Sequence, residues 1–217
     1  MSFSVPPELT TALTDLAIIP FAAAFFILIG RTGDAVYRRL WRALTVAMSV
    51  SGFGGFVVHG IVFPGETNEY LWLPLQTVML VTVILFACVL ICDISSKALG
   101  KAVVIAAVSV FAATAALTAV LLLTGKDYFS VFLITAALCV GPGLIVYPVL
   151  MAKGKRYAGY MFAGVLIQGL GMIPRILSLP SVFIVWEFDK SSMYHVAAIV
   201  SLCVFCAGVL KRGREKN

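Results

Sequence analysis

The chain has 217 residues, of which 61% are hydrophobic and only 12% are charged, and its mean hydropathy is +1.05. A soluble domain carries about twice that share of charged residues, so the composition excludes an ordinary soluble protein. The formal charge of +6 comes from basic segments between apolar runs, which gives no reason to expect nucleic acid as a partner.

Seven apolar runs of about twenty residues, the length that crosses a bilayer, predict an all-α, polytopic membrane protein. We expect a single domain over residues 1–217, a seven-helix bundle with spans at residues 9–30, 43–63, 71–92, 102–124, 129–151, 157–179 and 194–210. The N-terminus lacks the basic segment of a secretory signal, so we expect the first helix to be retained. Gly141-Pro142-Gly143 interrupts the fifth run and predicts a kink or break there.

The connecting segments predict an orientation. All Lys and Arg residues except Lys126, Arg175 and Lys190 fall at one end of the expected bundle. The positive-inside rule therefore places the N-terminus outside and the C-terminus in the cytoplasm. Residues 180–193 are apolar and then charged, and we expect them to lie along the membrane surface as a lid. The five cysteines all fall inside apolar runs, where they are expected to pack as small residues rather than form disulfides.

One stretch of the second run combines small and polar residues. Residues 51–60 read SGFGGFVVHG, which places Ser51, Gly55 and His59 on one helix face. Glycines beside a histidine in an apolar helix allow another helix or a ligand to approach the backbone. Ser51 lies about 12 Å from His59 along the helix, too far to be a nucleophile that His59 activates.

Five of the expected helices each place one polar residue in the same layer of the membrane. With a rise of 1.5 Å per residue, these residues all lie within about 9 Å of the outer end of their helix. They are Asp15, His59, Gln76, Arg175 and His195. An ionisable group at such a depth costs about 2.5–3.5 kcal/mol and normally faces a partner or a wet cavity.

This polar layer has two interpretations. In the first, Asp15 and Arg175 form one structural ion pair, and His59 and Gln76 satisfy the remaining hydrogen bonds. In the second, the layer is an outward-facing pocket for a ligand. The catalytic residues of that pocket are then His59, Asp15 and His195, with His59 as general base, and the ligand-binding residues are Arg175, Gln76 and Gly55.

The sequence also bears on two cofactors, zinc and retinal. Two histidines and a carboxylate are able to bind zinc, so His59, His195 and Asp15 form a less favoured zinc site. No lysine lies within the seventh span, so a retinal Schiff base is excluded.

Three short motifs carry a resemblance to known proteins. Residues 11–15 read Thr-Ala-Leu-Thr-Asp, residues 54–60 read Gly-Gly-x-x-x-His-Gly, and residues 189–195 read Asp-x(5)-His. The topology and these motifs resemble uncharacterised bacterial seven-helix membrane proteins and, distantly, the alkaline ceramidase and adiponectin-receptor (CREST) superfamily. The resemblance implies a seven-helix fold, a lipid-sized pocket and a bacterial inner (plasma) membrane location.

The sequence therefore predicts a membrane protein whose polar pocket binds, and in one version hydrolyses, a lipid or small amphiphile. The alternative is a non-enzymatic carrier, sensor or accessory subunit whose buried polar residues are structural. Membrane lipid is the expected partner in the first case, and other membrane proteins are expected partners in the second.

Overall fold

The computed structural model describes residues 2–3, 8–31, 34–63, 67–95, 101–125, 128–183 and 187–215. The helices are α1 (Glu8–Leu28), α2 (Ala35–Gly60), α3 (Thr67–Ile94), α4 (Lys101–Leu123), α5 (Phe129–Val140), α6 (Gly143–Ala152), α7 (Tyr157–Ile176) and α8 (Lys190–Glu215). A 3-10 turn at Ile29–Arg31 follows α1. Two short antiparallel pairs join β1 (Ser2–Phe3) to β2 (Ile61–Val62) and β3 (Val182–Phe183) to β4 (Glu187–Phe188).

Seven stretches of the described chain are long and apolar enough to cross a membrane, with α5 and α6 together forming one of them. The predicted all-α bundle of seven helices is therefore confirmed, and these helices support an integral membrane protein. The predicted break in the fifth span is also confirmed. Helix α5 ends at Val140 and α6 begins at Gly143, because Pro142 has no backbone N–H to continue the helical hydrogen bonds.

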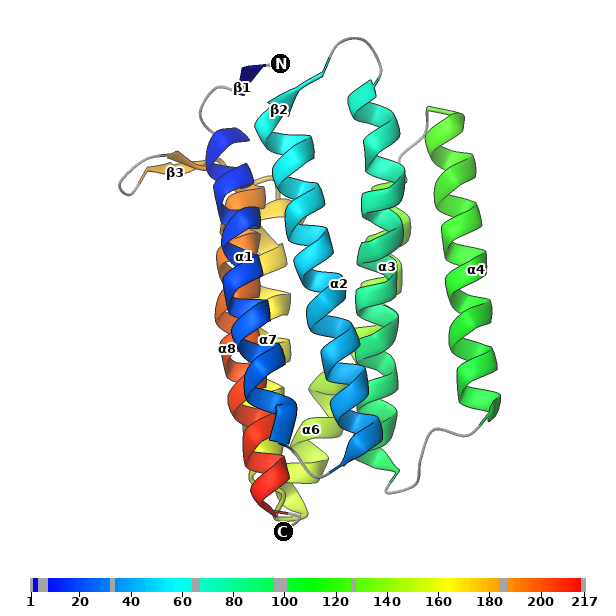
Figure 1. Cartoon of the computed structure of the whole chain (residues 1–217), viewed down its shortest axis with the longest axis vertical. Helices are drawn as coiled ribbons and strands as arrows, with labels where there is room; N and C mark the ends of the chain where they lie inside the picture. The colour runs from blue at the N-terminus through cyan, green and yellow to red at the C-terminus, as the bar shows by residue number, and fades with distance from the viewer. Residues whose placement is uncertain are drawn as a thin grey trace.

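The helices lie side by side in one bundle, as Figure 1 shows. Helix α1 packs on α2 and α8, α2 packs on α3, and α7 packs on α8. Helix α5 packs on α3 and α4, whereas α6 packs on α7. Helix α4 stands at one edge with most of its surface exposed, as expected for a lipid-facing span (Figure 1). We call the end where α1 begins the N-terminal end and the end where α8 finishes the C-terminal end.

The predicted spans at residues 43–63 and 194–210 left out charged residues that belong to the helices, because those residues were interpreted as loops. Helix α2 begins at Ala35 rather than at residue 43. Directly before this start, the side chain of Asp34 accepts a hydrogen bond from Tyr37 N at 3.1 Å. Such an N-cap satisfies a free backbone donor of the first turn. Helix α8 covers Lys190–Glu215 rather than residues 194–210.

The lid expected at residues 180–193 stays a prediction, and residues 184–186 of it lie outside the described residues. Part of residues 180–193 forms the β3–β4 hairpin, which extends to the side of the bundle, away from α2 and α3 (Figure 1).

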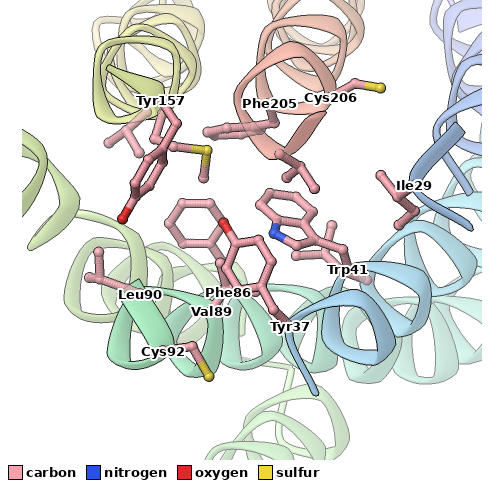
Figure 2. Packing of buried hydrophobic residues seen from close by; sticks show 14 of the residues in the cluster. Ile29, Tyr37, Trp41, Phe86, Val89, Leu90, Cys92, Tyr157, Phe205 and Cys206 are labelled. Atoms are coloured by element: carbon pink, nitrogen blue, oxygen red, sulfur yellow. The ribbon is translucent and has the colours of Figure 1, made fainter. Parts of the chain in front are cut away.

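An aromatic core fills the bundle toward its C-terminal end. The rings of Trp41, Phe86 and Phe205 lie 5.3–6.2 Å apart, and Phe25 stacks on Trp41 at 5.1 Å. Figure 2 shows Trp41, Phe86 and Phe205 turned toward one another between α2, α3 and α8. Of the five cysteines, all are free, and Cys88, Cys92 and Cys206 are buried as small packing residues.

Candidate functional site

A cavity of about 160 Å³ lies between the helices, on the N-terminal side of the aromatic core. One water needs about 10–15 Å³ of such volume, so the cavity has room for a small organic molecule. Its polar wall residues are Asp15, Ser51, His59, Trp72, Thr82, Gln168, Arg175, Ser191, Tyr194, His195 and Ser201. Its apolar wall includes Ile18, Leu44, Met48, Leu75, Met79, Val83, Phe86, Phe129, Phe132, Met172 and Phe205.

His195 of α8 is held by two side chains of α1. Its Nε2 atom lies 3.3 Å from Oδ1 of Asp15, and its Nδ1 atom lies 3.1 Å from Oγ1 of Thr14. Asp15 is 95% buried, with an exposed fraction of 5%. A buried carboxylate needs such partners, because its desolvation is otherwise uncompensated.

Glycines of α2 make the space that Asp15 occupies. A Cβ atom added at Gly55 would overlap the carboxyl group of Asp15, and one added at Gly52 would meet the Asp15 carbonyl oxygen at 2.6 Å. The absence of these side chains brings α1 close to α2, and Ser51, Gly55 and His59 share the predicted face at the cavity wall.

A second link between α1 and α8 lies next to the Asp15–His195 pair. Oδ1 of Asp189 accepts hydrogen bonds from Thr11 Oγ1, Ser192 N and Ser192 Oγ, each at 2.7 Å. Burial by itself raises the pKa of Asp189, but the hydrogen bonds from Ser192 and Thr11 outweigh it and hold the pKa below its usual value. Asp189 thus caps α8 as a carboxylate and orients His195 one and a half turns later.

These contacts bring the three sequence motifs together. Residues 11–15 supply Thr11 and Asp15, residues 54–60 supply Gly55 and His59, and residues 189–195 supply the cap and His195. The function of Thr11, Thr14 and Asp189 as supports of the site was not recognised from the sequence, although two of the motifs contain them.

Arg175 also lines the cavity but does not pair with Asp15, so the predicted Asp15–Arg175 ion pair is wrong. Its Nη1 atom donates to Ser191 Oγ at 3.0 Å, and its guanidinium carbon lies 3.9 Å from the centre of the Phe129 ring. The partner of Asp15 is His195, since α1 packs directly on α8.

His59 completes this end of the cavity. Its ring packs edge-on against Trp72, with centroids 5.3 Å apart, and its centroid lies 6.4 Å from that of His195. The structure therefore brings together His59, Asp15, His195, Arg175 and Gly55 at one cavity.

Gln76 does not join them, and its predicted function as a ligand-binding residue is corrected. It is fully buried on α3, is absent from the cavity wall, and neither atom of its amide has a hydrogen-bond partner. Leu75, the preceding residue on α3, lines the cavity instead, because neighbouring helix positions point about 100° apart.

A second buried polar cluster was missed by the sequence analysis. At the C-terminal end, Arg212 Nε lies 2.9 Å from Oδ1 of Asp93, and the hydroxyls of Tyr37 and Tyr147 donate to Oδ2 of Asp93 at 3.3 and 3.1 Å. Arg212 lies among the basic residues at the C-terminal end of the chain, where exposure is expected, yet only 5% of it is exposed. Its spacing from Phe205 and Val209 continues the buried stripe of α8, and that signal was present in the sequence.

The geometry limits the chemistry of the site. No cluster of three His, Cys, Asp or Glu side chains suited to a metal ion occurs in the described part of the chain, so the arrangement does not support zinc at His59, His195 and Asp15. His195 stands between a carboxylate and a hydroxyl, but the Thr14 hydroxyl bonds to the carbonyls of Thr10 and Thr11 and does not line the cavity. What the arrangement offers is a set of polar and charged groups for binding.

The fold and the site define a class: a seven-span helical membrane protein with an internal cavity that is polar at one end. The chain belongs to a family of unknown function, DUF6962, whose model matches residues 10–214. No curated protein and no solved structure matches the chain.

Proposed function

We propose that this protein binds a single-chain amphiphile with an anionic headgroup in the cavity between its helices. The observation that carries the proposal is the division of the cavity into two chemically different ends. Arg175, His59 and the Asp15–His195 pair lie at the N-terminal end, and Met48, Phe86 and Phe205 lie deeper. Pockets for small molecules commonly combine apolar walls with a few convergent polar groups.

The charge at the polar end favours an anion. Arg175 is a permanent cation at the cavity wall, where its guanidinium donates to the Ser191 hydroxyl, and Asp15 pairs with His195. A carboxylate or phosphate headgroup accepts charge-assisted hydrogen bonds from such a group. The apolar chain of the ligand then covers the deeper wall and excludes water from it. This burial stabilises the complex by about 25 cal/mol for each Å² of apolar surface buried.

The polar end faces the outside in this proposal, and the C-terminus lies in the cytoplasm. The basic residues flanking the C-terminal ends of the helices support this orientation through the positive-inside rule. The resemblance to the CREST superfamily accords with a lipid-sized pocket, and a bacterial inner membrane is the location we propose. Hydrolysis of the ligand stays a prediction.

Purified protein in lipid nanodiscs tests this proposal with decanoate as the anionic probe and decyltrimethylammonium as its cationic counterpart. We expect decanoate to bind and the cation to bind at least tenfold more weakly. Arg175→Gln should abolish this preference, and Arg214→Gln, which changes an exposed arginine of α8, should leave it intact. Mass spectrometry of wild type, His59→Ala and Arg175→Ala tests for a co-purified amphiphile.

Equal binding of the two probes, or binding of neither, would reject the proposed site. The protein would then fit the alternative of an accessory subunit of a membrane complex, whose partners are identified by crosslinking in the membrane.

A further inference from the structure

The deeper wall of the cavity carries four polar residues, and they fall into two kinds. Thr82 Oγ1 donates to Val78 O and Ser201 Oγ donates to Ala198 O, each at 3.0 Å within its own helix. The hydroxyl of Ser51 and the amide oxygen of Gln168 are buried and have no hydrogen-bond partner. Buried polar groups of native proteins are almost always paired, so these two need an explanation.

Ser51 and Gln168 lie on different helices, each about two turns from a residue at the polar end of the cavity. Ser51 is two turns from His59 along α2, or about 12 Å, and Gln168 is two turns from Arg175 along α7, or about 10 Å. His59 and Arg175 both belong to the polar end of the cavity. The two unpaired groups therefore form a second polar level. On the cavity wall, Met172 lies between Gln168 and Arg175, and Gly52 and Gly55 lie between Ser51 and His59.

We infer that Ser51 and Gln168 form a second recognition point, which selects amphiphiles carrying a hydroxyl about 10–12 Å from the anionic headgroup. A hydroxyl has one donor and two acceptor positions. It donates to the amide oxygen of Gln168 and accepts from the hydroxyl of Ser51. This inference rests on the proposed function, because the headgroup at Arg175 fixes which carbon atom of the ligand lies beside Ser51 and Gln168.

A hydroxyl is the fitting complement for two reasons. It has the donor that the amide oxygen of Gln168 lacks and an acceptor for the hydroxyl of Ser51, whereas a plain alkyl chain has neither. A site with buried polar groups rejects a ligand that lacks the matching group, because the unpaired groups remain desolvated. Rotation about Cα–Cβ is sufficient to turn the Ser51 hydroxyl toward a ligand, since the residue already forms part of the cavity wall.

The test compares ω-hydroxydecanoate with decanoate on the full chain in nanodiscs by titration calorimetry. We expect the hydroxylated probe to bind about tenfold more tightly, as two satisfied hydrogen bonds allow. The double variant Ser51→Ala, Gln168→Leu should bind both probes equally. Thr82→Val is the matched control: it removes a cavity hydroxyl that is already bonded to its own helix, and it should keep the tenfold preference.

The outcomes separate the two proposals. Equal binding of both probes by the wild type overturns the second recognition point and leaves the proposed function standing. A preference that survives in the double variant overturns the assignment to Ser51 and Gln168. Binding of neither probe overturns the proposed function and this inference with it. Decanoate binding by the double variant shows that it is folded.

Discussion

Gly55 has no side chain at the point where the carboxyl group of Asp15 packs against α2. This absence leaves room for the Asp15–His195 pair between α1 and α8. An added methyl group has no free space there, because it would overlap the Asp15 carboxyl group. At Gly54, one residue away, an added Cβ would meet only the flexible Leu75 side chain, at 3.1 Å. The two neighbouring glycines thus differ sharply in what they tolerate.

Gly55→Ala should therefore displace Asp15 and lower both thermal stability and decanoate binding. We expect a loss of about 1–3 kcal/mol in the free energy of unfolding, the usual cost of overpacking. Gly54→Ala is the control and should cost less, since alanine also favours the helix. Thermal unfolding in detergent measures both. A Gly55→Ala protein as stable as Gly54→Ala would show that the carboxyl group of Asp15 lies elsewhere.

Asp15 pairs with His195, whereas depth along the helices had predicted an ion pair of Asp15 with Arg175. In a double-mutant cycle, Asp15→Asn and His195→Gln should couple by about 0.5–3 kcal/mol, because the two side chains touch. The cycle of Asp15→Asn with Arg175→Gln should be additive within about 0.5 kcal/mol. Denaturant titration in detergent gives the free energy of unfolding of the six proteins in the two cycles. A larger coupling of Asp15 with Arg175 than with His195 would support the Asp15–Arg175 pair instead.

At the scale of the helices, α8 is fastened at both of its ends. His195 and Asp189 join it to α1, and Arg212 joins it to α3 through Asp93. Arg212 also donates to Cys92 O and stacks over the Tyr37 ring at 3.6 Å. The charges at this second junction are buried together, so each depends on the other for compensation.

Removing one charge of that junction should strand the other. Arg212→Gln should cost about 3–5 kcal/mol in stability, as measured by thermal unfolding in detergent, and adding Asp93→Asn should recover part of the loss. Arg214→Gln is the matched control, since Arg214 is exposed two residues later on α8. Equal effects of Arg212→Gln and Arg214→Gln would contradict a structural function of the junction.

The same helices show what the sequence was able to predict. Hydropathy located all seven spans and Gly141-Pro142-Gly143 located the break, because length and a missing N–H act locally. The starts of α2 and α8 and the burial of Arg212 were missed. In each case a charged residue was interpreted as a loop residue, although capping or a tertiary partner holds it in or beside a helix.

For the site, depth along the helix selected four residues that line one cavity, but it did not predict their directions. Gln76 does not line the cavity, and Asp15 pairs with α8 rather than α7. Depth follows from the rise per residue, whereas direction depends on how each helix is rotated against its neighbours. The α3 stretch has no clear polar face to fix that rotation.

At the scale of the whole molecule, the proposed orientation decides from which side a ligand reaches the polar end. Two turns offer equivalent sites to test it. Gly125 joins α4 to α5 at the N-terminal end, and Gly154 joins α6 to α7 at the C-terminal end. Both have positive φ, and an added side chain would meet nothing within 4 Å, so these turns are open to insertions.

Reporters placed at these two turns should give opposite results. Fusion of alkaline phosphatase, which is active only outside the cytoplasm, should give activity after Gly125 and none after Gly154. Fusion of green fluorescent protein, which matures in the cytoplasm, should give the reverse pattern, with fluorescence also after Asn217. The physical reason is the basic residues around Gly154, Lys153, Lys155 and Arg156, which the membrane retains on the cytoplasmic side. Replacing these three residues by Gln should weaken the bias, whereas the same replacement at Lys126 should not. Phosphatase activity after Gly154 would show that the molecule has the opposite orientation, with the polar end of the cavity toward the cytoplasm.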